Sequence, residues 1–140
     1  GKAEIKVEFY NGQFINVEIF TEPVQELLKH ADFISLHVPA QKDYIIGKNE
    51  FSMMKDGVGI VNCSRGGIIN EVELIASLDS KKVLFAGLDV FENEPTPAVQ
   101  ILMHPQISLT PHIGAATLEA QERISIELAE QIIGLLKSEI

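Results

Sequence analysis

Three polar positions follow three successive apolar, strand-like runs of this sequence. Arg65 follows the first run and directly precedes the glycine pair Gly66-Gly67. A carboxylate, Glu92 or Glu94, follows the second run, and His112 follows the third. Because the carboxyl ends of parallel strands meet at one edge of a sheet, these side chains are expected to lie near one another. An arginine, a carboxylate and a histidine are the minimum set for moving a hydride and a proton on a small anion.

The chemistry of each residue type sets what it would do at that edge. Arginine presents a planar fork of N–H donors that matches a carboxylate, and the glycines beside Arg65 allow a ligand to approach the backbone closely. Histidine can donate a proton to a developing alkoxide or accept one from an alcohol. A glutamate beside His112 would hold its tautomer. From the residues alone, Glu92 and Glu94 are equal candidates, and the ordinary alternative for all of these side chains is a solvated surface loop.

Composition limits the partners and the surroundings. The chain has 140 residues, 46% of them hydrophobic, and a formal net charge of −9. This length predicts one domain, residues 1–140, and the negative charge argues against nucleic acid as a partner. The apolar runs are far shorter than the roughly 20 residues that span a membrane, so no membrane partner is expected. The single cysteine, Cys63, excludes an internal disulfide and fits a cytoplasmic location. No His or Cys spacing predicts a metal site.

Hydrophobic periodicity predicts strands that alternate with helices. Two extended runs, 4–10 and 14–20, flank Asn11-Gly12, which is a hairpin signal, and the alternation in the first run predicts a half-buried strand. Further strands are predicted at 32–38, 57–62, 83–90 and 106–109. The order of these elements predicts an α/β fold, namely a Rossmann-like parallel sheet with helices on both faces.

Polar residues mark the predicted starts of the helices. Thr21, Asn49 and Asn70 are expected to cap helices that end near residues 29, 54 and 80, and Glu73 is expected to complete a capping box with Asn70. Thr117 is expected to cap a long helix that runs to about residue 138. That helix carries an apolar stripe, which predicts that one of its faces is buried: Ile124, Leu128, Ile132 and Leu135.

Four ordered motifs carry a resemblance to a known family. They are Ala31-Asp32-Phe33-Ile34-Ser35-Leu36-His37-Val38-Pro39, Asn62-Cys63-Ser64-Arg65-Gly66-Gly67, Gly87-Leu88-Asp89-Val90-Phe91-Glu92-Asn93-Glu94-Pro95 and Thr110-Pro111-His112-Ile113-Gly114. With the gaps between them, they closely resemble the NAD-dependent D-2-hydroxyacid dehydrogenase family, and within it the D-3-phosphoglycerate dehydrogenase branch. The likeness runs from about Val17 to Lys137.

The resemblance implies an oxidoreductase that transfers a hydride between NAD(H) and a small anionic 2-hydroxy or 2-oxo acid. It implies that Arg65 binds the substrate carboxylate, that His112 is the acid/base, and that Glu94, which directly precedes a proline, is the catalytic glutamate. It also matches these positions to the nicotinamide side of the cofactor site: Val38, Pro39, Cys63, Ser64, Arg65, Asp89, His112 and Gly114. Asp89 could instead cap a turn. The particular acid and the choice between NAD and NADP stay open, and so does a homodimer.

The sequence also departs from that family. It contains no Gly-x-Gly-x-x-Gly turn, the element that cradles the cofactor pyrophosphate, and Asn11 stands where a ribose-binding acid is expected. The chain thus resembles the carboxyl-terminal two-thirds of a cofactor domain, a truncated cofactor domain, and weak affinity for NAD is expected. The strand at 4–10 is expected to enter the sheet in place of the family's first strand. The alternative function is a non-catalytic fragment or remodelled Rossmann-like domain with a vestigial Arg/Glu/His triad.

Overall fold

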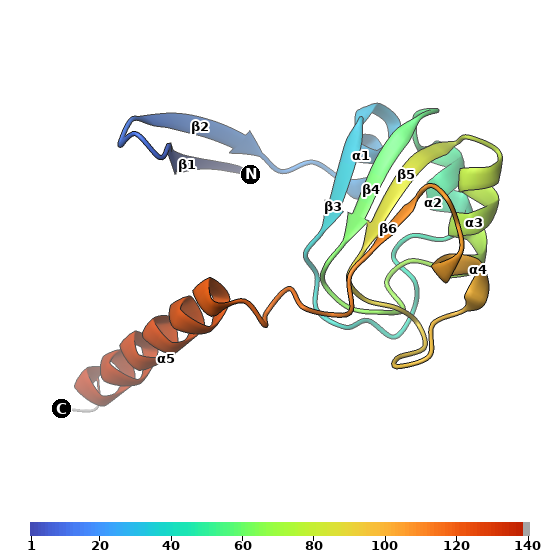
Figure 1. Cartoon of the computed structure of the whole chain (residues 1–140). Helices are drawn as coiled ribbons and strands as arrows, with labels where there is room; N and C mark the ends of the chain where they lie inside the picture. The colour runs from blue at the N-terminus through green and yellow to red at the C-terminus, as the bar shows by residue number, and fades with distance from the viewer. Residues whose placement is uncertain (139–140) are drawn as a thin grey trace.

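The computed structural model describes residues 1–138, and its centre is a parallel sheet (Figure 1). Strands β3, β4, β5 and β6 lie side by side in that order, which confirms the predicted α/β, Rossmann-like class. In chain order the elements are β1 (Lys2–Glu8), β2 (Phe14–Phe20), α1 (Val24–His30), β3 (Phe33–Leu36), α2 (Lys48–Met53), β4 (Val58–Asn62), α3 (Glu71–Asp79), β5 (Val83–Leu88), α4 (Val99–Leu102), β6 (Ile107–Leu109) and α5 (Leu118–Ser138).

Helices α1 to α4 lie along one face of this sheet (Figure 1). Right-handed crossovers between strands that advance in one direction place every connecting helix on the same side. Ile34, Ile60 and Ala86 face that side and are buried in the core. On the other face, Phe33 and Phe85 are 74% and 43% exposed, and their ring centroids lie 6.0 Å apart. The expectation of helices on both faces therefore holds for one face only within residues 1–138.

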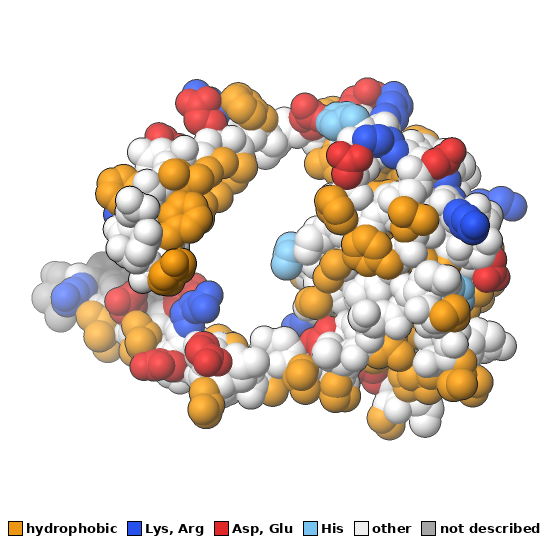
Figure 2. Space-filling view, turned by 45° about the horizontal axis from the view of Figure 1, so that its top comes forward, with side chains coloured by type: hydrophobic (Ala, Val, Ile, Leu, Met, Phe, Trp, Pro, Cys, Tyr) orange, Lys and Arg blue, Asp and Glu red, His pale blue; other side chains and the backbone are white. Residues whose placement is uncertain are grey.

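Strands β1 and β2 form a separate antiparallel hairpin. The predicted turn at Asn11-Gly12 is confirmed, with Gly12 at a φ of +78°. The prediction that the first strand enters the main sheet is wrong, and so is its predicted half-burial, because most of β1 is exposed. The short turn between Phe9 and Gln13 ties β1 to its antiparallel neighbour, whereas insertion beside a parallel strand needs a long crossover. Hydrophobic side chains gather on the hairpin and on the part of the globule that faces it (Figure 2).

The N-caps of the first two helices each lie two residues away from the predicted caps. Pro23 is the N-cap of α1 and no side chain caps that helix, so Thr21 does not have the predicted role. Gly47 is the N-cap of α2, and its N–H donates to Glu50 Oε2 at 3.0 Å. Asn49 therefore lies inside the first turn and does not have the predicted role, and the side-chain acceptor at this end of the helix is Glu50, which bonds the N–H of the N-cap residue.

Two other predicted caps are confirmed. Asn70 Oδ1 accepts from the N–H of Glu73 at 3.0 Å at the start of α3. The N–H of Asn70 donates to the carbonyl of Ile46, which lies before α2, and not to the side chain of Glu73. The predicted capping box is therefore only half formed. Thr117 Oγ1 accepts from the N–H of Ala120 at 3.1 Å at the start of α5.

Helix α5 extends away from the sheet domain (Figure 1). The prediction that its apolar stripe is buried is wrong for the described residues, because the stripe is exposed: Ile124, Leu128, Ile132 and Leu135. Hydrophobic periodicity predicts which face of a helix is apolar, but whether that face is buried depends on a surface that packs against it. Within residues 1–138, every helix is too short or too polar to span a lipid bilayer.

Candidate active site

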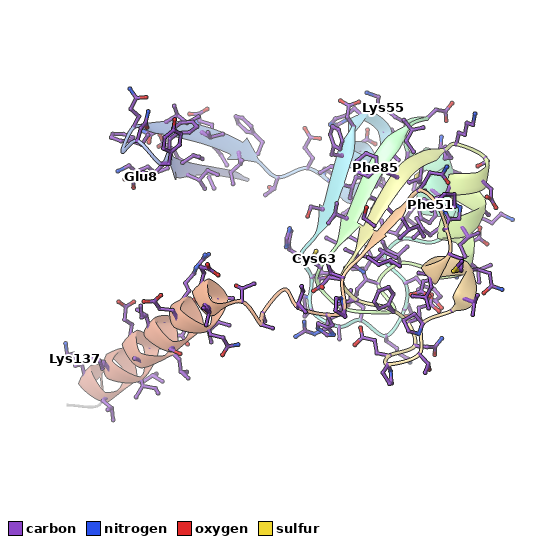
Figure 3. All side chains as sticks on the ribbon, in the orientation of Figure 1. Glu8, Phe51, Lys55, Cys63, Phe85 and Lys137 are labelled. Atoms are coloured by element: carbon purple, nitrogen blue, oxygen red, sulfur yellow. The ribbon has the colours of Figure 1, made fainter. Side chains whose placement is uncertain are left out.

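The Arg65 loop, residues 63–67, is held in shape by the last residue of β4. Asn62 is buried, and its Oδ1 accepts from both the N–H and the hydroxyl of Ser64 at 3.1 and 2.8 Å. Its Nδ2 donates to the carbonyl of Arg65 at 3.0 Å. The Arg65 side chain is exposed and donates to the Ser64 carbonyl at 2.7 Å. Cys63, labelled in Figure 3 at the carboxyl end of the sheet, is also exposed.

The Arg65 loop packs directly on the loop that carries the two candidate glutamates. A Cβ atom on Gly66 would lie 1.8 Å from the carbonyl oxygen of Phe91, so only glycine permits this approach. Beside this contact, Glu92 Oε1 accepts from the N–H of Glu71 at 2.8 Å. Glu92 is therefore directed toward the start of α3.

Glu94, and not Glu92, contacts the histidine. His112 Nδ1 lies 2.8 Å from Glu94 Oε2, and the ring nitrogen is the donor because a carboxylate only accepts. Glu94 Oε1 accepts from the N–H of Phe91 at 3.0 Å. The bonds from His112 and Phe91 hold the pKa of Glu94 below its ordinary value. Because the bond to Glu94 uses Nδ1 of His112, the other ring nitrogen, Nε2, is available to a ligand.

Asp89 fixes the loop on which the histidine lies. Its carboxylate is 3% exposed and accepts from the Thr110 hydroxyl at 2.6 Å and from the N–H groups of Ile113 and Gly114, both at 2.8 Å. Burial raises the pKa of Asp89, but these three bonds outweigh it and lower the pKa. His112 itself has a φ of +56°, a conformation that costs a non-glycine residue free energy. Of the two roles left open for Asp89, capping a turn is the one observed.

A cavity of about 480 Å³ adjoins the Glu94–His112 dyad, a volume within the usual range for a small-molecule site. Its wall is mostly apolar, and its lining residues are Phe91, Glu94, Pro95, Pro97, Leu102, Leu109, Thr110, Pro111 and His112. The structure thus brings Glu94 and His112 together in one cavity and leaves Arg65 on the neighbouring loop.

The remaining predicted cofactor positions lie at the carboxyl ends of the strands. Val38 and Pro39 follow β3, with Val38 packed partly against the core and Pro39 exposed. Three positioning residues were missed from the sequence: Asn62, Thr110 and Glu71. The first two carry a usable signal, a polar side chain at the end of an apolar strand, whereas a glutamate in the first turn of a helix is ordinary. Residues 1–138 contain no group of three His, Cys, Asp or Glu side chains that could hold a metal ion.

Comparison with known proteins agrees with this geometry. Residues 7–114 match the model of the D-isomer specific 2-hydroxyacid dehydrogenase NAD-binding domain. The chain is 46% identical over 129 residues to D-3-phosphoglycerate dehydrogenase 3, chloroplastic, of Arabidopsis thaliana, covering 90% of this chain and 22% of that protein. It is 50% identical over 111 residues to hydroxypyruvate reductase of Thermotoga maritima, covering 76% of this chain and 36% of that protein.

A solved structure of the same kind is also similar. D-lactate dehydrogenase from Aquifex aeolicus, crystallised with NAD and lactic acid, superposes with a TM-score of 0.65 at 31% identity, over 84% of this chain and 40% of that one. The chain therefore spans well under half the length of each of these proteins. The match covers the sheet and all three loops of the candidate site, and it confirms the predicted family: the chain belongs to the D-isomer specific 2-hydroxyacid dehydrogenases and carries their NAD-binding domain.

Proposed function

We propose that this chain supplies the nicotinamide-side and acid/base part of an oxidoreductase that interconverts small anionic 2-hydroxy and 2-oxo acids. The observation that carries the proposal is the 2.8 Å bond between His112 Nδ1 and Glu94 Oε2, at the mouth of a small-molecule cavity. Asp89 holds the strained backbone of His112 with bonds to the two residues that follow it. Backbone strain that the surrounding structure maintains in this way is concentrated at functional sites, which supports the proposal.

The proton is handled by residues of this chain. In the reducing direction, protonated His112 donates from Nε2 to the carbonyl oxygen of the substrate, and in the oxidising direction neutral Nε2 accepts the proton of the alcohol. Glu94 keeps the other nitrogen protonated and stabilises the imidazolium. Arg65, whose guanidinium reaches solvent on the adjoining loop, binds the substrate carboxylate through two N–H donors. The hydride at C2 of the acid would be supplied or accepted by NAD(H) when it is bound.

The residues present fit the nicotinamide end of that cofactor better than its pyrophosphate end. The dyad and its mostly apolar cavity lie at the carboxyl ends of the strands, and a parallel sheet of this kind binds its ligands at that edge. In contrast, residues 1–138 contain no Gly-x-Gly-x-x-Gly turn, the element that binds the pyrophosphate in this fold. We therefore propose weak NAD binding by these residues alone.

A fluorescence titration tests this proposal. NADH should saturate the protein below about 1 mM, roughly −4 kcal/mol, and oxamate should then bind to the NADH-bound form. Arg65→Lys removes the two-pronged donor and should weaken oxamate at least about tenfold, since a charge-assisted pair contributes about 1.5–3 kcal/mol. Arg123→Lys makes the same change at an exposed arginine of α5 and should have no effect. Equal oxamate binding by the two variants would contradict the role of Arg65.

The second candidate function is a non-catalytic Rossmann-like domain that retains a vestigial triad. The sequence of residues 1–138 favours it, because it contains no Gly-x-Gly-x-x-Gly turn, the element that binds the cofactor pyrophosphate in this fold. A folded protein that shows no NADH saturation in the same titration would support this candidate over the oxidoreductase.

We further propose a cytoplasmic location and a homodimer. The location is supported by Cys63, an exposed cysteine in a chain that has no second cysteine. The dimer is supported by the exposed apolar stripe of α5, which a second copy would cover. Light scattering at two protein concentrations tests the dimer, and a mass equal to one chain at both concentrations would contradict it.

A further inference from the structure

Two glutamates outside the dyad exchange hydrogen bonds between distant parts of the chain. Glu71 is the first residue of α3, and Glu92 lies on the loop after β5. The N–H of Glu71 donates to Glu92 Oε1 at 2.8 Å, and the N–H of Glu92 donates to Glu71 Oε1 at 2.7 Å. Glu71 is 7% exposed. Each carboxylate therefore satisfies the backbone donor of the other residue, which would otherwise lose a partner in a buried place.

This pair lies beside the contact between the Arg65 loop and the loop that carries Glu94. The backbone of Gly66 packs on the carbonyl of Phe91, so the Arg65 loop and the Glu94 loop touch there. The N–H of Phe91 in turn donates to Glu94 Oε1 at 3.0 Å. A continuous path of contacts thus joins the residue after Arg65 to the dyad. The Glu71–Glu92 pair adds a contact between the same loop and the start of α3.

We propose that Glu71 and Glu92 are positioning residues that set the Arg65 loop against the Glu94–His112 dyad. Two bonds of opposite direction between Glu71 and Glu92 fix the start of α3, four residues after Gly67, against the loop that carries Glu94, and together with the Gly66 contact they hold the Arg65 loop to that loop at two points. The roles given to Arg65 and His112 rest on the proposed function. The placement of the two loops does not.

The electrostatics of the pair predict which substitution it tolerates. Burial raises the pKa of Glu71, the bond from the Glu92 backbone opposes this, and the Glu92 charge adds to the rise. Burial therefore disfavours the charge of Glu71, whereas its oxygen Oε1 is the acceptor that the bond from Glu92 uses. Glutamine offers the same oxygen without the charge, so Glu71→Gln should retain the pair, whereas Glu71→Ala should break it.

The test follows the Glu94 carboxyl group by carbon-13 NMR titration of the protein. In Glu71→Ala and in Glu92→Ala, the Phe91 turn should loosen and the pKa of Glu94 should rise toward its ordinary value of 4.5. Oxamate binding to the NADH-bound form should weaken about tenfold. Glu71→Gln should match the wild type in both measurements. Glu73→Ala, which removes another acidic side chain from the same helical turn, is the matched control and should also match it.

The outcomes separate positioning from simple stabilisation. If Glu71→Ala lowers the unfolding temperature but leaves both the Glu94 titration and oxamate binding unchanged, the proposal is overturned. If Glu71→Ala does not fold, Glu92→Ala, on the half-exposed loop, gives the same readout. Failure of the proposed function has a different signature, because the wild type then binds neither NADH nor oxamate while the Glu94 titration still responds to Glu71→Ala.

Discussion

Replacing Asp89 by asparagine tests how the His112 loop is held. The carboxylate accepts from Thr110 and Ile113 on one oxygen and from Gly114 on the other. The asparagine oxygen can keep the first two bonds, but its amide nitrogen then faces the N–H of Gly114, so two donors meet. One charge-assisted bond, worth about 1.5–3 kcal/mol, is lost and two become neutral. We expect Asp89→Asn to lower the free energy of unfolding by about 3 kcal/mol.

The assay is thermal and urea unfolding followed by circular dichroism at pH 7. For a chain of 140 residues, an unfolding entropy of about 2.1 cal/mol/K per residue converts about 3 kcal/mol into a drop of about 10 °C in Tm. Asp43→Asn, the same change at an exposed residue, is the control and should stay within about 0.5 kcal/mol of the wild type.

The pH dependence gives the prediction a second arm. The pKa of Asp89 in the folded protein lies below its ordinary value of 3.8, since its three bonds outweigh the effect of burial. A depressed pKa means that the stabilisation is complete above 3.8 and is lost as the pH falls through the folded-state pKa. The difference between Asp89→Asn and the wild type should therefore shrink below that pH. A difference under about 1 kcal/mol at pH 7, or one that stays constant into acid, would refute the reasoning.

Three further predictions concern the same loops. Gly66→Ala would place its Cβ 1.8 Å from a backbone carbonyl oxygen of the next loop and should lower the free energy of unfolding in urea by about 3 kcal/mol. Gly134→Ala on α5, where a Cβ would have nothing within 4 Å, is the control and should raise that free energy by up to about 1 kcal/mol. Equal effects of the two substitutions would contradict the loop contact. His112→Gly should be about 1 kcal/mol more stable than His112→Ala in the same assay, because the φ of +56° penalises any side chain, and equal stabilities would argue against strain. Asn62→Ala should cost about 2 kcal/mol and speed amide exchange in the Arg65 loop, since two backbone groups lose their partner; unchanged exchange would count against this role.

Features that depend on neighbouring residues could be predicted from the sequence. The turn at Asn11-Gly12, the cap at Asn70 and the alternation of parallel strands with helices all follow from local conformational preference and periodicity. The location of the hairpin could not, because an amphipathic strand suits any sheet edge and only long-range packing selects one. The sequence also could not show that α1 to α4 cover only one face of the sheet, because the apolar residues of β5 suit a sheet that is covered on both faces equally well.

At the site, chemistry was easier to predict than contacts. The residue types at the three strand ends indicated an arginine, a carboxylate and a histidine at one edge of the sheet. The choice of Glu94 over Glu92 came from the family resemblance alone, because the two lie on one loop and differ only in which way the turn directs them. The positioning role of Glu71 could not be predicted, because it depends on hydrogen bonds with Glu92, which lies after the next strand, β5.

The central claim, that His112 held by Glu94 transfers the proton, is tested most directly by single-turnover reduction of glyoxylate with NADH in the intact protein. His112→Gln removes the titrating group while keeping a polar side chain of similar length. The account predicts that this variant reduces glyoxylate about 10² to 10⁴ times more slowly, the usual contribution of a general acid, with an unchanged Kd for NADH. A loss of less than about tenfold, with NADH still bound, would show that His112 is not the acid/base.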